Sequence, residues 1–386
     1  MAIIMSELPR DLVEEVLTRV PLTSLRAVRL TCKNLNDISK DGSFIKKHIV
    51  EAKKKQVNEF ELIIVMNCKI YLMSVDPHSN VDPYITLKGT LFSLKDDAND
   101  HQVDDIVSVF DCDGLLLCIT RDLNSRLLVW NPYFGETRWI QPRDRYHDMD
   151  VYALGYDEKK KYKIFRFVDD YYSYSYIEEE QICELEVYSF ESDSWKVVLN
   201  VTPEWNIYYY HSGVSLKGNT YWYATNKVRR RGGYDVVVFL ICFDFTTERF
   251  GPRLPLPFST CNIYDIVTLS SAGEDQLAVL FHDGFTSAMG IWVTSKIEPT
   301  EVSWNKLSLA DDMGMLISNI PTNDRSFFID VKKNVAVVLD RGARYIAYII
   351  GDKEYFEEVD LGESADLNCW PLVCSYVPST VQIRQL

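Results

Sequence analysis

The hydrophobic positions near the N-terminus follow a helical period. One apolar stripe is predicted by residues that recur at i, i+3, i+4 and i+7, namely Val13, Val16, Leu17 and Val20. Pro9 suits the first position of this helix, and Pro21 predicts its end. A second helix, capped by Thr23 or Ser24, is predicted to place on one face Leu25, Val28, Cys32 and Leu35. Two helices this short do not bury their apolar faces alone, so the pattern favours a docking element.

A connecting helix is predicted within residues 37–57, packed back on the first two. Its apolar positions again have helical spacing, at Phe44, Ile45, His48 and Ile49. Beyond about Phe60 the pattern changes to short β-rich runs separated by turns. We therefore predict a small helical domain at residues 1–57 and a larger, mainly β domain at residues 58–386.

The β-rich runs repeat along the chain. Half of the repeat is an aromatic-containing strand, a polar turn and a second strand marked by Trp or Phe. The second markers lie 56, 55, 54 and 52 residues apart, at Trp139, Trp195, Phe250, Trp304 and Phe356. A weaker copy begins at Ile70. Another turn and strand precede each clear copy, at residues 113–119, 160–167, 218–224, 274–281 and 333–339.

A period near fifty residues with three or four short strands is typical of a propeller blade. Each small sheet is apolar on both faces, and only neighbouring blades bury them, which explains the recurring aromatic residues. Five clear copies and one weak copy predict about six blades. The alternative is an irregular β-sandwich.

The N-terminal run resembles the F-box, the motif by which substrate receptors attach to SCF ubiquitin ligases through a Skp-family adaptor. The matching residues are Leu8-Pro9, Asp11-Leu12, Val16-Leu17, Arg19-Val20-Pro21, Ser24-Leu25 and Cys32-Lys33. One departure is Leu35, where the family usually has Trp. Leucine keeps this site apolar but removes a large buried surface, and a reduced adaptor affinity is the expected consequence. The alternative for the whole run is an ordinary helix pair that caps the next domain.

The β-rich part resembles the plant F-box-associated domain. The matching stretches are residues 112–116, 130–132, 154–157, 213–222, 243–250, 254–258, 291–293 and 376–379. Together the two resemblances imply an α+β protein, with a small N-terminal helical F-box followed by a mainly-β propeller-like repeat domain. They cover nearly the whole chain.

The resemblance implies a substrate-recognition subunit of an SCF-type E3 ubiquitin ligase that performs no bond chemistry itself. Such a subunit works by proximity, because it raises the effective concentration of a target lysine near the charged thioester. Cullin and RING subunits would join through the adaptor, and the target protein is not predictable from framework motifs. The residues expected to bury against the adaptor are Leu8, Pro9, Leu12, Val16, Leu17, Val20, Pro21, Leu25, Val28 and Cys32.

The net charge of −15 changes the expected partners. Residues 1–55 hold 11 Lys/Arg and 7 Asp/Glu, so this part carries +4 and the remainder −19. A domain this acidic repels phosphate backbones, which disfavours nucleic-acid binding. No run reaches the roughly 18 apolar residues of a membrane helix, and we expect no secretory signal. Nine cysteines without a CxxC pair favour reduced thiols in the cytoplasm or nucleus.

Catalytic and metal-binding patterns are missing from the sequence. Residues 213–217 lack the second glycine of a nucleophile elbow, and no glycine-rich phosphate loop is present. Residues 111–114 match the start of a calcium loop without its distal glutamate, so a hairpin turn is predicted there. Acidic doublets such as Asp169-Asp170 and Glu357-Glu358 are interpreted as solvated loops. We expect no cofactor and no metal; a β-propeller enzyme (hydrolase or oxidase) and a stand-alone interaction protein remain the alternatives.

Two tyrosine-rich segments are the candidates for target recognition. Tyrosine offers a large, rigid contact area with a polar tip, and alternation with serine is common in binding loops. The first segment contains Tyr171, Tyr172, Tyr174 and Tyr176, and the second contains Tyr208, Tyr209 and Tyr210. The alternative is that alternate tyrosines face the core of ordinary strands.

Overall fold

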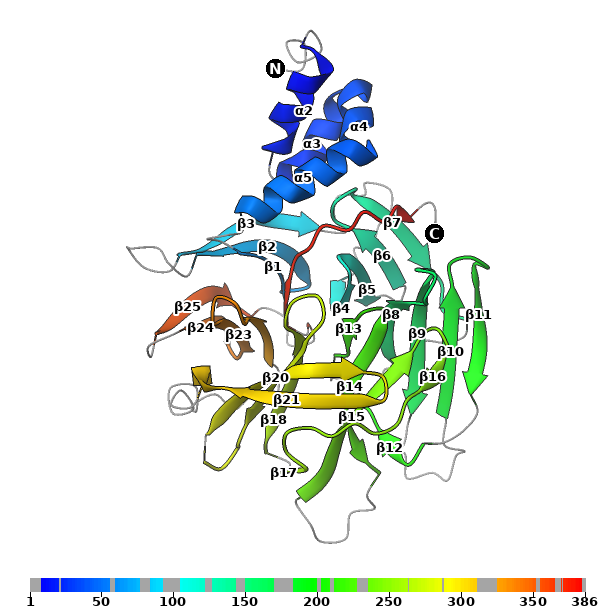
Figure 1. Cartoon of the computed structure of the whole chain (residues 1–386), viewed down its shortest axis with the longest axis vertical. Helices are drawn as coiled ribbons and strands as arrows, with labels where there is room; N and C mark the ends of the chain where they lie inside the picture. The colour runs from blue at the N-terminus through cyan, green and yellow to red at the C-terminus, as the bar shows by residue number, and fades with distance from the viewer. Residues whose placement is uncertain are drawn as a thin grey trace.

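The computed structural model in Figure 1 describes most of the chain. The described residues are 8–20, 22–55, 60–76, 84–92, 105–121, 127–143, 150–169, 183–199, 203–208, 212–227, 235–262, 264–286, 288–310, 325–351, 355–364, 369 and 371–383.

Helices form the N-terminal part of the described chain: α2 (Arg10–Thr18), α3 (Leu22–Thr31), α4 (Lys33–Ser39) and α5 (Gly42–Lys55). Pro9 is the N-cap of α2 and lies outside it, with an extended ψ of 144°. The prediction of one helix through Leu35 is wrong, because Cys32 adopts an extended conformation (φ −160°, ψ 157°) and separates α3 from α4. The carbonyl of Cys32 then accepts the first bond of α4, from the backbone N–H of Asn36 at 3.2 Å.

The β-rich part forms six small sheets, which confirms the predicted number of blades. The first sheet contains β1 (Phe60–Met66), β2 (Lys69–Asp76), β3 (Tyr84–Phe92) and β26 (Leu372–Ser375). The second contains β4 (Asp105–Cys112), β5 (Leu115–Arg121), β6 (Leu127–Asn131) and β7 (Glu136–Ile140). The third contains β8 (Val151–Tyr156), β9 (Tyr162–Asp169), β10 (Cys183–Ser189) and β11 (Ser194–Leu199).

The fourth blade is more elaborate than the others. Its strands are β12 (Trp205–Asn206), β13 (Val214–Leu216), β14 (Asn219–Asn226), β15 (Asp235–Asp244), β16 (Arg249–Phe250) and β17 (Thr260–Asn262). The fifth contains β18 (Ile266–Ser271), β19 (Leu277–His282), β20 (Met289–Glu298) and β21 (Glu301–Leu307), followed by the short helix η2 (Ser308–Ala310). The sixth contains β22 (Arg325–Asp330), β23 (Val335–Arg341), β24 (Arg344–Ile350) and β25 (Phe356–Glu363).

The blades close into a ring, and this excludes the alternative of a β-sandwich. The innermost strands contact one another in the order β26, β4, β8, β13, β18, β22 and back to β26. The C-terminal strand β26 completes the first blade, where Leu62 pairs with Ser375 in antiparallel register. The weak sequence copy at Ile70 is therefore real: it is the third strand of a blade whose first strand comes from the other end of the chain.

Aromatic side chains fill the spaces between blades, as the repeat predicts. Between the third and fourth blades, Phe165 and Phe243 lie with their ring centroids 4.6 Å apart, and the indole of Trp222 is 5.1 Å from Phe165. All three residues are fully buried in one apolar cluster. This packing supplies the inter-blade burial that a single sheet lacks.

Of the two predictions made for polar positions, the structure confirms one and contradicts the other in part. The hairpin turn at residues 111–114 is confirmed, because Asp113 (φ 51°) and Gly114 (φ 75°) join β4 to β5. The interpretation of the acidic doublets as solvated loops is wrong about the loops, because the described positions lie in strands; Glu358 is exposed as predicted, whereas the Asp169 side chain is buried. Asp169 ends β9 and is buried against the ammonium of Lys227 at 2.6 Å, while Glu357 and Glu358 belong to strand β25.

Candidate functional site

A row of exposed apolar side chains runs along α2. Leu8, Leu12 and Val16 are 39%, 44% and 46% exposed and follow one another at intervals of four residues, which places them on one side of the helix. Pro9 is also exposed at the start of the row. We call these four residues the α2 ridge. Exposed apolar side chains that form a continuous row are typical of a protein–protein contact.

The predicted stripe of four residues is divided by the structure. Val13 and Leu17 are 1% exposed and lie in the core between the helices, whereas Val16 belongs to the ridge. The ridge begins at Leu8, before the helix, which is why the stripe predicted from residue 13 onward missed its direction. The periodic pattern identified the helix correctly, but it grouped residues of the buried side, Val13 and Leu17, with Val16 of the exposed side.

Not all ten predicted adaptor contacts have free surface. Leu17 and Leu25 are buried inside the chain, so in this conformation they support the ridge and have no area to bury against a partner. Their contact with the adaptor stays a prediction, and in the free chain their role is structural. Val20, Val28 and Cys32 are half-buried against the same core, and Pro21 lies outside the described residues.

Charged side chains hold α2 against α5. The Glu14 carboxylate accepts a bond from Arg10 Nε at 3.0 Å and another from Lys47 Nζ at 3.0 Å. Glu14 is buried although its partners are exposed, and Lys47 followed by Arg10 lowers the pKa of its carboxyl. These contacts fix the side of α2 that carries Val13 and Leu17 toward the core and leave the ridge outside.

Leu35 is also a core residue. It is 3% exposed and packs in the cluster that contains Val13, Leu17, Leu25 and Phe44. A tryptophan at this position would therefore enter the core of the helical domain. The expectation that leucine reduces contact area with the adaptor does not follow from this geometry.

The helical domain is seated on the first and second blades (Figure 1). Its core is continuous with apolar residues of these two blades, including Ile63, Trp130, Tyr133 and Phe134. His48 of α5 lies 5.6 Å from the ring of Tyr133 and is also within 3.0 Å of the Val20 carbonyl. We call Tyr133 and Phe134, which lie in the turn between β6 and β7, the seat.

Arg29 of α3 is the polar centre of this contact. Its guanidinium donates to the backbone carbonyl of Tyr133, and its Nε donates to Ser39 Oγ at 3.0 Å. The same group lies 5.3 Å from the ring centroid of Tyr133 and 5.6 Å from that of Phe134. Arg29 thus binds both to its own domain and to the propeller.

A pair of exposed aromatic rings lies on the fifth blade. One ring belongs to the segment between β17 and β18, and the other to the segment between β19 and β20. There Tyr264 (56% exposed) and Phe285 (69% exposed) meet edge to face, with ring centroids 5.4 Å apart. Gly284 approaches Tyr264 so closely that an added Cβ would lie 2.3 Å from the Tyr264 carbonyl oxygen, so the two segments are in contact.

The predicted target-binding tyrosines are largely beyond this description. Tyr171, Tyr172, Tyr174, Tyr176, Tyr209 and Tyr210 lie outside the described residues. Tyr208 is half-buried next to β12. The segment of the first four tyrosines joins β9 to β10, and both strands contribute to a cluster of buried charges.

Arg166 of β9 is the centre of that cluster. Its guanidinium binds the carboxylates of Asp150 at 3.0 Å and Glu186 at 2.8 Å, and Arg143 binds the other oxygen of Glu186 at 3.0 Å. Burial opposes the charge of Arg166, but the two carboxylates outweigh it and raise the pKa of this guanidinium above its usual value. Every carboxylate here is neutralised by an arginine, so the cluster joins strands and offers no free acid or base.

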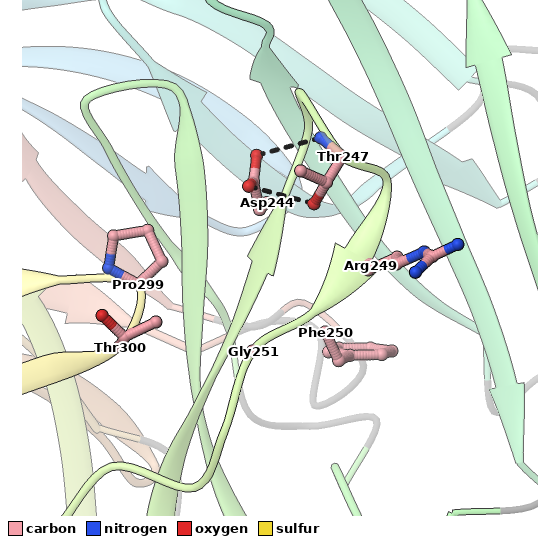
Figure 2. Close-up of a pocket in the computed structure, with 7 residues that line it drawn as sticks. All are labelled: Asp244, Thr247, Arg249, Phe250, Gly251, Pro299 and Thr300. Carbon is pink, nitrogen blue, oxygen red and sulfur yellow. Dashed lines mark hydrogen bonds between the residues drawn. The ribbon is translucent and has the colours of Figure 1, made fainter.

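A shallow groove of about 450 Å³ lies between the fourth and fifth blades (Figure 2). The Asp244 carboxylate accepts bonds from the Thr247 hydroxyl at 3.0 Å and from the backbone N–H of Thr246 at 2.7 Å, so it closes the turn. Arg249 points away from this pair, and its position leaves no acid–base couple. Among the described residues, no three His, Cys, Asp or Glu side chains lie close enough to hold a metal ion. None of the described helices is long and apolar enough to cross a membrane.

Comparison with known proteins agrees with both halves of this architecture. A family model described as the F-box domain matches residues 5–47, and one described as the F-box associated beta propeller domain matches residues 61–383. The chain belongs to this F-box family. It is 61% identical over 397 residues to the F-box protein At2g17830 of Arabidopsis thaliana, with 99% of each chain covered.

Two further comparisons leave this family assignment unchanged. The F-box/kelch-repeat protein At3g16740 of Arabidopsis thaliana is 54% identical over 403 residues, which covers 98% of this chain and 99% of that protein. A solved structure, the Hadza microbial sialidase Hz136, aligns with a TM-score of 0.45 at 11% identity, over 79% of this chain and 68% of that one. A structural similarity this weak carries no argument about activity.

The bounds of the family matches correspond to structural features of this F-box protein. The F-box match includes the ridge, the break at Cys32 and Arg29, and it ends within α5. The propeller match continues past β26 to Ile383, so it includes the segment that crosses from the first blade to the second. The seat and the ring closure therefore both belong to the family's domain.

Proposed function

We propose that this F-box protein is the substrate-recognition subunit of an SCF-type E3 ubiquitin ligase. The ridge docks to a Skp-family adaptor, through which the cullin and RING subunits join. The propeller binds a target protein, and its predicted contacts remain the tyrosines of the two tyrosine-rich segments, namely Tyr171, Tyr172, Tyr174, Tyr176, Tyr208, Tyr209 and Tyr210. The subunit has no catalytic role of its own and acts in the cytoplasm or nucleus.

The exposed ridge is the observation that supports this proposal. Leu12 and Val16 lie on α2, and Leu8 lies just before it, on the side of the helix opposite the buried Val13 and Leu17; the row contacts no core cluster of the described chain. Burying a whole aliphatic side chain contributes about 1.5–3 kcal/mol, so each half-exposed residue of the ridge has about 1 kcal/mol available for binding. The family supplies the chemistry of the partner: an adaptor with a complementary apolar surface.

The experiment is a binding titration of the purified full chain with a plant Skp-family adaptor. Leu12→Asp and Val16→Asp each place a carboxylate in the apolar contact, which costs several kcal/mol when it is buried without a partner. We expect each to weaken the affinity at least about 100-fold, since 1.4 kcal/mol corresponds to a factor of ten. Both sites are exposed in the free protein, so its unfolding temperature should change little.

Val237→Asp is the matched control. Val237 is a valine of β15 with 47% exposure, close to the 46% of Val16, but it lies on the propeller. Its substitution should leave adaptor affinity unchanged. The proposal fails if the wild-type chain does not bind the adaptor, or if the two ridge variants bind as well as the Val237→Asp control.

A further inference from the structure

Arg29 is a buried arginine whose neighbours come from two domains. It is 8% exposed and lies between α4 and the seat. From its own domain, Ser39 accepts two bonds, one at its hydroxyl (3.0 Å) and one at its carbonyl (3.4 Å). From the propeller, the Tyr133 carbonyl accepts a third bond and two aromatic rings cover the guanidinium.

The contacts of Arg29 require one orientation of its guanidinium. Within the described chain Arg29 is bound by neutral oxygens and ring faces and forms no ion pair, and burial lowers the pKa of its guanidinium. A buried charge without a counter-charge is stable only when its donors are satisfied with good geometry. The planar guanidinium supplies several donors in fixed directions together with a stacking face, which an ammonium does not. A small rotation of the helical domain would break both the bond to Tyr133 and the ring contacts.

Hydrogen bonds to the side chain of Asn131 hold the backbone of the seat in place. Asn131 is fully buried, and its side-chain oxygen accepts the backbone N–H groups of Tyr133 at 2.8 Å and Phe134 at 3.3 Å. Its side-chain nitrogen donates to the carbonyls of Ser379 at 3.2 Å and Val381 at 2.6 Å in the C-terminal segment. The carbonyl that receives Arg29 is therefore fixed to the closed ring.

We propose that Arg29 is a positioning residue that locks the helical domain on the second blade. The ridge then has one distance and one angle to the propeller. The consequence for ubiquitin transfer rests on the proposed function, because a target held at a constant place relative to the adaptor presents a restricted set of lysines. The lock itself is a property of this chain alone.

The test measures the distance between the two domains in the full chain. Spin labels are attached through a ketone-bearing amino acid at two exposed positions, Lys46 on α5 and Val197 on β11, so the nine native cysteines do not interfere. Double electron–electron resonance gives the distance distribution. The wild type should show one narrow peak, and Arg29→Met should widen it at least twofold. Arg29→Lys should be intermediate, because lysine keeps the charge but not the planar fork.

Arg19→Met is the matched control. Arg19 lies in the same helical domain, but it is exposed, and its ion pair within the described residues is with Glu15 of the same helix at 2.7 Å. The distance distribution of Arg19→Met should stay as narrow as that of the wild type. If Arg29→Met does not fold, Phe134→Ala removes one ring of the seat and should widen the peak in the same way. An unchanged peak in whichever of these two variants folds overturns the proposal.

Adaptor affinity separates this inference from the proposed function. Arg29→Met leaves the ridge intact, so its affinity for the adaptor should remain within about twofold of wild type. If the wild type does not bind the adaptor, the proposed function fails while the distance measurement still decides the lock. If Arg29→Met loses adaptor affinity with an unchanged distance distribution, Arg29 is an adaptor contact and the lock is refuted.

Discussion

The substitution Leu35→Trp tests the corrected role of a residue that departs from the F-box pattern. If Leu35 contacted the adaptor, tryptophan would enlarge the contact and strengthen binding. The structure places Leu35 at 3% exposure in the core of the helical domain, against Val13, Leu17 and Phe44. Tryptophan would then be forced into a space already filled, and the expected result is a loss of stability with no gain in affinity.

The magnitude follows from the packing. Adding side-chain volume to a filled core displaces neighbours from their rotamers and typically costs 1–3 kcal/mol, which lowers the ratio of folded to unfolded chain by about five- to 150-fold. The helical core continues into the first two blades, so relaxation of the helices also disturbs the seat. We expect a lower denaturation midpoint and weaker binding only as far as the folded fraction falls.

Two measurements on the full chain decide the question. Urea denaturation followed by tryptophan fluorescence and circular dichroism reports stability, and titration with the adaptor well below the transition reports affinity. Leu30→Trp is the control, because Leu30 is 79% exposed on α3 and a larger side chain there meets solvent. Tighter adaptor binding by Leu35→Trp, with an unchanged denaturation midpoint, would refute the assignment of Leu35 to the core.

Other predictions concern the propeller. Burial, followed by the charge of Asp113, raises the pKa of the Asp111 carboxyl to about 7. The folded state therefore binds the carboxyl proton more tightly than the unfolded state does. The stabilisation of the folded state by this proton is fully present below pH 4 and is lost as the pH rises to 7. The unfolding temperature of the wild type should therefore fall more between pH 5 and pH 8 than that of Asp111→Asn; equal falls would contradict this. Gly114→Ala should cost more than about 3 kcal/mol, because the residue has a φ of 75° and the added Cβ would lie 1.9 Å from the Val377 carbonyl oxygen; a normal midpoint in urea would show that the C-terminal segment yields easily. Arg166→Met should cost about 3–5 kcal/mol, since it leaves Asp150 and Glu186 buried with one partner fewer, and calorimetry of this variant against Arg143→Met (a more exposed arginine) should show the larger loss at Arg166.

The propeller was predictable because its repeat is marked by Trp and Phe residues, which recur where neighbouring blades pack together. Trp139, Trp195 and Trp304 mark fourth strands, and the aromatic strands before them fill the space between blades. The spacing of these markers therefore determined both the unit and its number. The closure of the first blade by β26 was not predictable in the same way, because it pairs residues about 300 positions apart and leaves no local pattern.

The orientation of α2 was only partly predictable for a similar reason. A stripe of apolar residues indicates that a helix has a buried side, but Val16 and Leu17 are adjacent and both apolar, so the pattern alone does not separate the core from the ridge. The tertiary contacts of Glu14 with Lys47 decide the rotation, and they join α2 to a helix about 30 residues away. The break at Cys32 was missed because cysteine carries no strong helix-ending signal.

Asn131 shows how one residue of a recognised motif links the two halves of the protein. Residues 130–132 belong both to the internal repeat and to the stretch that resembles the family's domain, and the hydrogen bonds of Asn131 show why this position requires an asparagine. Its oxygen shapes the turn that presents Tyr133 to Arg29, and its nitrogen holds the segment that follows the closing strand. Aspartate would lack the two donors and leucine would lack both functions. Ring closure and seating of the helical domain are therefore coupled at one buried side chain, so a chain whose ring has not closed also lacks the surface that orients its helical domain.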